Sequence, residues 1–160
     1  MIKQIQISLM AYIMFAIGSF NIQAQEVKMK GAQLWRTLAD VRYEIQQDEY
    51  GDLYVPVFSE EVKKAKGQIV EVEGFIIPFE GMFKPTQLIL SSLPISECFF
   101  CGSGGPETVM EISMKPDEKV KYTTKRVKIR GRLVLNAENP DKLMYLLEEG
   151  TYAGLAEDSY

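Results

Sequence analysis

The segment Lys125–Leu135 reads Lys-Arg-Val-Lys-Ile-Arg-Gly-Arg-Leu-Val-Leu, and its central residues alternate between apolar and basic side chains. A period of two residues is typical of a β-strand that buries one face and exposes the other to water. The apolar face contains Val127, Ile129, Gly131, Leu133 and Leu135, and the basic face contains Arg126, Lys128, Arg130 and Arg132. The segment therefore predicts a strand with one face against a core.

Other segments repeat this pattern around the first one. Within Gly67–Pro78 the residues that share the apolar face are Val70, Val72, Gly74 and Ile76, and Pro78 ends the strand. Further extended segments are predicted at Val41–Ile45, Leu53–Phe58, Thr86–Ser91 and Thr108–Met114, with a turn over Gln46–Asp52. The region from Asn139 to Gly150 allows either a helix or a strand over Met144–Leu147, and we expect the strand.

Two short helices are predicted before the main run of strands. Leu34, Trp35 and Leu38 recur at helical spacing within Gly31–Asp40. Ser59 is a good N-cap for a second helix, which Gly67 can end.

Glycine also indicates how the strands are arranged. Gly74 and Gly131 lie in the middle of their strands, where a tightly curved sheet needs to bend. We predict a mainly β fold: a small oligonucleotide/oligosaccharide-binding (OB-like) barrel with short N-terminal helices. A β-sandwich is the alternative.

The first residues predict export from the cytoplasm. Lys3 precedes an uncharged, mostly apolar run from Ile5 to Phe20, and Ala24 offers a small residue at a cleavage site, which together are typical of a secretory signal peptide. The run is shorter than a membrane span needs. We expect a signal peptide over 1–24, a single β-rich domain with loose ends over 25–160, no stable membrane span after cleavage, and a periplasmic or secreted location.

Composition excludes several kinds of function. The chain has 22 acidic and 18 basic residues and a formal net charge of −4, and an acidic domain is a poor nucleic-acid binder because the phosphates repel it. Histidine is absent, which rules out Ser-His and Cys-His catalytic machinery within this chain. We therefore expect no enzymatic activity, although thiol redox chemistry stays open.

The two cysteines stand in the segment Pro94-Ile-Ser-Glu-Cys-Phe-Phe-Cys-Gly-Ser-Gly-Gly-Pro-Glu107, between two predicted strands. Three interpretations compete for Cys98 and Cys101: a disulfide, a metal site, or a thiol–disulfide exchange centre. An oxidising compartment favours a disulfide. The glycines after Cys101 disfavour the helix that lowers the pKa of an exchange cysteine. They are better explained as residues that let the chain turn tightly around the sulfurs.

For a metal site, two thiolates suit zinc or Cu(I). A closed zinc site needs four ligands, so Glu97, Glu107 or a second subunit would have to complete it. Met110 and Met114 are conceivable copper ligands, but their spacing on one strand face favours core packing.

The basic stripe Arg126, Lys128, Arg130 and Arg132 also has two interpretations. It can be an interaction surface for another envelope protein. It can equally pair across strands with carboxylates such as Glu71 and Glu73 on a solvated face, and we favour this pairing.

Three stretches resemble a known bacterial family. They are Gly67–Pro78, Cys98-Phe-Phe-Cys-Gly with Gly105-Pro-Glu107, and Val127–Leu133. They resemble the exported family filed as domain of unknown function 3299, over roughly Trp35 to Leu147. Members are typically secreted or lipoprotein-type and have no established activity, and some accompany metal-import systems. The resemblance implies a site at Cys98 and Cys101 and a role near metal import.

These observations lead to one main hypothesis and two alternatives. The main hypothesis is an exported envelope accessory protein, non-enzymatic, whose Cys98/Cys101 loop holds zinc or copper. Its partner would be an envelope protein or a metal-import component, and a homo-oligomer is also open. The alternatives are a thiol–disulfide redox factor and a structural adaptor that binds another envelope protein.

Overall fold

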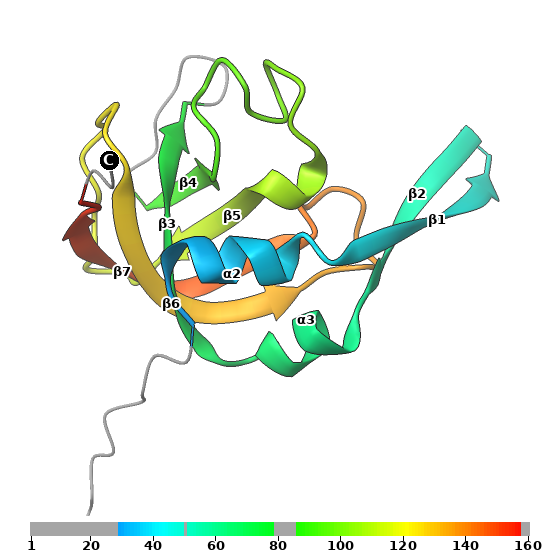
Figure 1. Cartoon of the computed structure of the whole chain (residues 1–160), viewed down its shortest axis with the longest axis horizontal. Coiled ribbons are helices and arrows are strands. Elements are labelled where there is room, and N and C mark those ends of the chain that lie inside the picture. Colours follow the sequence, from blue (N-terminus) through cyan, green and yellow to red (C-terminus); the bar gives the residue numbers. More distant parts are fainter. Residues whose placement is uncertain (1–28, 50, 79–85, 158–160) are drawn as a thin grey trace, which may run out of the picture.

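The computed structural model describes residues 29–157 apart from residue 50 and residues 79–85 (Figure 1). In chain order the elements are helix α2 (Gly31–Leu38), strands β1 (Val41–Asp48) and β2 (Gly51–Phe58), helix α3 (Glu60–Ala65), strands β3 (Ile69–Ile77) and β4 (Gln87–Ser91), the short 3-10 helix η1 (Pro106–Thr108), and strands β5 (Val109–Met114), β6 (Val127–Leu135) and β7 (Tyr145–Leu155). The predicted signal peptide lies outside the described residues. None of the described helices is long and apolar enough to span a membrane.

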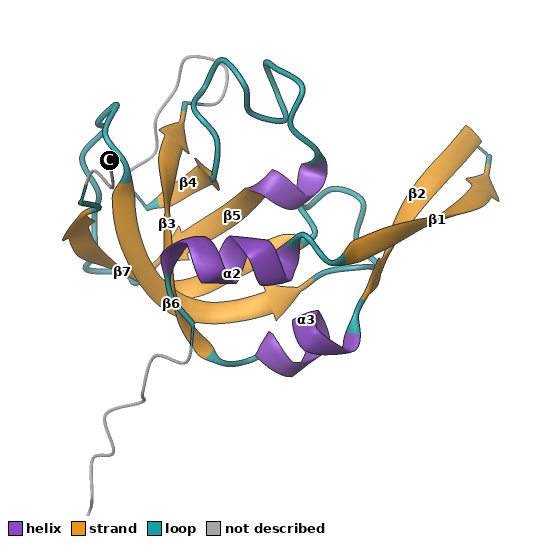
Figure 2. Ribbon diagram, in the orientation of Figure 1, coloured by secondary structure: helices purple, strands orange, loops and turns teal. Residues whose placement is uncertain are grey.

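Strands β3 to β7 form a closed barrel in the order β3-β4-β5-β7-β6 (Figure 2). The first barrel strand, β3, pairs antiparallel with both β4 and β6, while β5 and β7 run parallel. Numbered along the chain, the five strands follow one another around the barrel as first, second, third, fifth and fourth. This is the strand order of an OB-like barrel. The predicted fold class is confirmed, and the β-sandwich alternative is not found.

Alternating side chains explain the barrel. Burial in β3 alternates over most of the strand, and Val70 and Val72 are fully buried. Gly74 is required by a close approach: a Cβ there would collide with the carbonyl oxygen of Ser91. At Gly131 a Cβ would lie 2.7 Å from the Glu148 carbonyl oxygen. Both glycines therefore let neighbouring strands approach in a tightly curved sheet, as predicted.

The two helices close the barrel interior. Leu34 and Leu38 of α2 are fully buried, and the Trp35 indole Nε1 donates a hydrogen bond of 2.7 Å to the carbonyl oxygen of Glu73. The Ser59 hydroxyl accepts from the amide of Val62, which confirms the predicted N-cap of α3. Gly67 follows this helix at φ +76°, a conformation that glycine adopts easily.

Strands β1 and β2 form a separate two-stranded antiparallel hairpin that extends away from the barrel (Figure 1). Its base is anchored by Phe58, whose ring packs on that of Tyr145 with centroids 5.8 Å apart. Farther out, Ile45 lies opposite Tyr54, and both side chains are about 60% exposed.

Two sequence predictions need correction in their extent. The turn predicted over Gln46–Asp52 is shorter, because the strand pairing continues outward to Asp48 opposite Gly51. The strand expected at Met144–Leu147 exists, but β7 begins at Tyr145 and continues to Leu155 because it pairs along nearly all of β6. The alternative helix from Asn139 is not formed.

Candidate thiol site and the neighbouring groove

Cys98 and Cys101 lie on one tight turn in the connection between β4 and β5. The carbonyl oxygen of Cys98 accepts hydrogen bonds from the amides of Cys101, at 3.2 Å, and Gly102, at 2.8 Å. The Cys98 thiol is also near enough to be one of the causes that raise the pKa of the Cys101 thiol. The turn therefore holds the two cysteines close together in one loop.

The two thiols differ in their surroundings. Cys98 is fully buried, whereas Cys101 is exposed, and both are free cysteines. Local desolvation, then the neighbouring charge of Cys98 and the hydrogen bond to it, raise the pKa of the Cys101 thiol. A raised pKa reduces the population of the thiolate, which is the reactive form in thiol–disulfide exchange.

The glycines after Cys101 allow this loop to close on itself. A Cβ at Gly102 would lie 2.5 Å from the Cα of Glu97, and one at Gly104 would lie 2.8 Å from the Glu97 carbonyl oxygen. That same carbonyl accepts from the amide of Gly104 at 3.0 Å. This geometry agrees with glycines chosen for a tight turn around the sulfurs.

The two candidate auxiliary ligands lie on either side of the thiols in sequence. Glu97 is exposed, and Glu107 is partly buried, with its Oε2 accepting a 3.3 Å hydrogen bond from the Tyr43 hydroxyl. Within the part of the chain that the structure describes, no three or more histidine, cysteine, aspartate or glutamate side chains are grouped so that they could hold a metal ion. Among the described residues, no third carboxylate or thiol therefore joins Cys98 and Cys101 to complete a metal site.

The methionines weighed as copper ligands are core residues. Met110 is fully buried and Met114 is 8% exposed, and both belong to the hydrophobic core of the barrel. Their spacing on one strand face therefore reflects packing, as expected.

The basic stripe on β6 is largely paired with carboxylates. Arg130 lies 3.0 Å from Glu71, and Arg126 lies 3.4 Å from Glu73 on the neighbouring strand β3. Arg132 forms a third pair, 3.5 Å from Glu149, and Lys128 faces Glu73 in the β3–β6 register. The expected cross-strand pairing is confirmed, although Glu71 and Glu73 are only 13% and 24% exposed, so this face is less solvated than expected.

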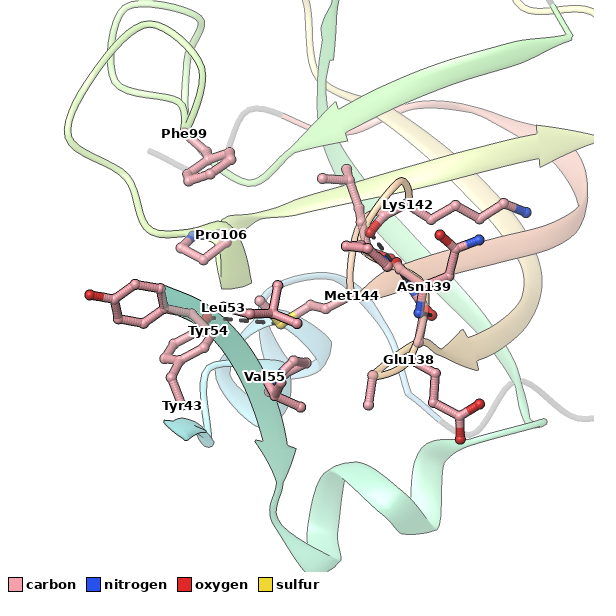
Figure 3. Close-up of a pocket in the computed structure, with 15 residues that line it drawn as sticks. Tyr43, Leu53, Tyr54, Val55, Phe99, Pro106, Glu138, Asn139, Lys142 and Met144 are labelled. Atoms are coloured by element: carbon pink, nitrogen blue, oxygen red, sulfur yellow. Dashed lines mark hydrogen bonds between the residues drawn. The ribbon is translucent and has the colours of Figure 1, made fainter. Parts of the chain in front are cut away.

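A groove of about 300 Å³ lies beside the cysteine loop (Figure 3). One wall is the β1–β2 hairpin, the other is the loop between β6 and β7, and Phe99 from between the cysteines lies at one end. The lining residues are Tyr43, Leu53, Tyr54, Val55, Pro56, Phe99, Pro106, Asn136, Ala137, Glu138, Asn139, Pro140, Lys142, Leu143 and Met144. Phe99 thereby connects the thiol site to the groove.

This groove was not predictable from the sequence. It joins segments about eighty residues apart, and only their packing brings them together. The signal present in the sequence was the run Leu53–Phe58, which is apolar at consecutive positions rather than at alternate ones. Such a run is unusual for a hairpin strand that has water on both faces.

The fold and the site define a class: a small OB-like barrel that carries a thiol-bearing loop and a projecting hairpin. No family model and no curated protein matches the sequence. Among solved structures, the chain is similar to the crystal structure of a DUF3299 family protein from Pseudomonas aeruginosa PAO1. The identity is 13% and the TM-score 0.42, over 61% of this chain and 66% of that one, just under two thirds of its length. Membership of that family stays a prediction.

Proposed function

We propose that this protein is an exported accessory binding protein of the cell envelope, without enzymatic activity, and that Cys98 and Cys101 together bind one soft metal ion. The observation that supports the proposal is that both cysteines lie on a single tight turn, in which the amide of Cys101 donates a hydrogen bond to the carbonyl oxygen of Cys98. We also propose that the Cys-Phe-Phe-Cys-Gly segment with Gly105-Pro-Glu107 marks membership of the DUF3299 family.

Between the two metals considered, the ligand set favours Cu(I). Two thiolates suffice for Cu(I), which is a soft ion. Zinc in a closed site requires four ligands, and the described residues group no third acidic or thiol side chain with the pair. A zinc site would need ligands from a partner or a second copy of the chain.

The redox alternative has less support from the thiols themselves. An exchange cysteine needs a lowered pKa, and the pKa of the exposed thiol, Cys101, is raised. A metal ion can still bind there, because it displaces the thiol protons, although binding then depends on pH. We expect Cu(I) affinity to increase as the pH rises towards the pKa of Cys101.

The test is a Cu(I) titration of the reduced protein against a chromogenic Cu(I) chelator, with native mass spectrometry to give the stoichiometry. We expect one Cu(I) per chain and at least a hundredfold loss of affinity in both Cys98→Ser and Cys101→Ser. Ser96→Ala, an exposed change in the same loop, is the matched control and keeps the affinity of the unmodified protein.

Two results would contradict the proposal. One is Cu(I) affinity that is unchanged by Cys98→Ser. The other is a Cys98–Cys101 couple with a reduction potential below about −300 mV, which is typical of a structural disulfide. If the protein binds zinc only when it dimerises, the further ligands that a zinc site needs come from a second copy of the chain.

A further inference from the structure

We propose that the groove beside the hairpin binds an extended segment of a partner protein, which adds as a third strand to the free edge of β2. One bulky apolar side chain of this segment fills the groove, and basic residues flank it. This second binding function does not depend on metal binding at the cysteines.

The lining of the groove shows that it opens onto the edge of a strand. Four consecutive residues of β2, Leu53 to Pro56, contribute to it. Successive side chains of a strand point to opposite faces, so one face alone would supply only alternate residues. Four consecutive residues in the lining are what a groove that runs along the edge of β2 gives.

That edge has hydrogen-bonding groups to offer. Among the described residues, β1 is the one strand that pairs with β2. Paired residues alternate between hydrogen-bonded and non-hydrogen-bonded positions. Asp48 pairs with Gly51 at the end of the register nearest the tip. If that pair is a hydrogen-bonded one, the backbone groups of Asp52 and Tyr54 point away from β1. Pro56 has no amide hydrogen, so it limits the addition to the outer half of the hairpin.

The groove itself favours an apolar side chain over a sugar or another polar ligand. The amide of Asn136 is engaged within the loop, where it donates to the carbonyl oxygens of Asn139, Lys142 and Leu143 at 2.8 to 3.3 Å. The side-chain oxygen of Asn139 likewise accepts from the amide of Asp141. The Tyr43 hydroxyl is bonded to Glu107. With these polar groups engaged, what the groove presents is mainly apolar and aromatic surface.

Charge indicates the character of the flanking residues. The hairpin tip carries Glu49 and Asp52, and Glu138 lies in the groove lining, whereas Lys142 is the basic residue of that lining. Together the hairpin tip and the groove lining thus carry three acidic residues to one basic residue, and this balance is complementary to a segment with lysine or arginine beside its apolar anchor.

The hairpin also has exposed apolar surface for such a partner to cover. Ile45 and Tyr54 face each other across the strands at 60% and 61% exposure. A two-stranded hairpin is marginally stable in water, and a third strand would stabilise it. Strand addition is an established way for a sheet edge to bind an extended peptide.

The probe is a display library of random nine-residue peptides, selected on the reduced, full-length mature protein. We expect enrichment of sequences with a bulky apolar residue flanked by lysine or arginine. The selected peptide, made synthetically and labelled, is then measured by fluorescence anisotropy. Tyr54→Ser should weaken its binding at least fivefold, whereas Tyr152→Ser, a similar change at an exposed tyrosine of β7, should not.

The backbone contribution is tested without changing the protein. Two versions of the peptide are made, one N-methylated at its odd-numbered amides and the other at its even-numbered amides. Each version loses the amide hydrogens along one edge of the peptide strand. The version that loses the edge facing β2 should bind at least tenfold more weakly. The proposal is overturned if selection yields no enriched peptide, if acidic flanks are selected, or if neither N-methylated peptide binds more weakly. Self-association of the protein that Tyr54→Ser abolishes would also overturn it, because a second copy would then fill the groove. Peptide affinity should be the same with and without added Cu(I), which separates this result from the metal test.

Discussion

The barrel and the β1–β2 hairpin are both built from antiparallel strands, but they differ in what covers their side chains. In β6 alternate residues such as Ile129 and Leu133 are completely buried. In the outer hairpin the apolar residues Ile45 and Tyr54 are about 60% exposed. The barrel therefore supplies the stability of the fold, and the hairpin is the part that can be devoted to binding, because little of the core depends on it.

The largest expected effect tests this division directly. Leu133→Ala removes a fully buried side chain from the barrel and should lower the free energy of unfolding by about 2–5 kcal/mol. Ile45→Ala, in the exposed hairpin, should change it by less than about 0.5 kcal/mol. Urea denaturation followed by circular dichroism measures both. A comparable loss from the two substitutions would mean that the hairpin is part of the cooperative core.

A second prediction separates close packing from backbone conformation. Gly74→Ala places a methyl group against the backbone carbonyl of Ser91 and should cost about 1–3 kcal/mol through overpacking. At Gly67 there is open space, and the constraint is its positive φ angle. Asparagine tolerates that conformation, so Gly67→Asn should be nearly neutral, whereas Gly74→Asn should be at least as costly as Gly74→Ala. Thermal unfolding of the four proteins compares the two mechanisms.

The difference in burial between the barrel and the hairpin also explains which parts of the fold could be predicted from the sequence. The barrel strands were predictable because burial on one face imposes an alternating pattern, which Val127–Leu135 and Ile69–Ile77 both contain. The curvature was predictable from Gly74 and Gly131. The length of the hairpin was less predictable, since residues such as Gln46 and Gln47 face water and carry no pattern that separates strand from turn.

The candidate site was predictable only in part. The proximity of Cys98 and Cys101 follows from their spacing, because three residues span a single turn. The groove could not be predicted, because it depends on the packing of the hairpin against the β6–β7 loop. That packing brings Tyr43 to Glu107 and to the sulfur of Met144, a contact between residues 101 positions apart.

A third prediction concerns a buried hydroxyl where the two regions meet. Tyr145 is fully buried, and its hydroxyl donates to the carbonyl oxygen of Leu38. Burial, then the nearby Tyr43, Glu107 and Asp40, raise the pKa of Tyr145 well above its usual value. Tyr145→Phe should cost about 1 kcal/mol at neutral pH through the lost hydrogen bond.

The raised pKa of Tyr145 also predicts how the stability of the fold changes with pH. Because the pKa of Tyr145 is higher in the folded state, its contribution is fully present below the unfolded pKa of about 10 and is lost as the pH rises above that value. Stability of the unmodified protein should therefore fall steeply between about pH 10 and pH 12, and less steeply in Tyr145→Phe. Tyr54→Phe, at an exposed tyrosine, is the control. An unchanged slope in Tyr145→Phe would contradict the assignment.

The smallest expected effect lies on the outside of the barrel. Glu71 and Arg130 are 3.0 Å apart, with side chains 13% and 46% exposed, and because the arginine stays in contact with water the pair contributes about 1 kcal/mol. A double-mutant cycle of Glu71→Gln and Arg130→Gln should give a coupling energy in this range, and it should shrink between about 0.01 M and about 1 M salt because the charges are screened. A coupling well above this value that salt does not reduce would show that the charged exterior shares in the stability of the barrel. The β3–β6 face would then be the first place where the exterior adds to stability, because Arg126 and Arg130 pair there with Glu73 and Glu71.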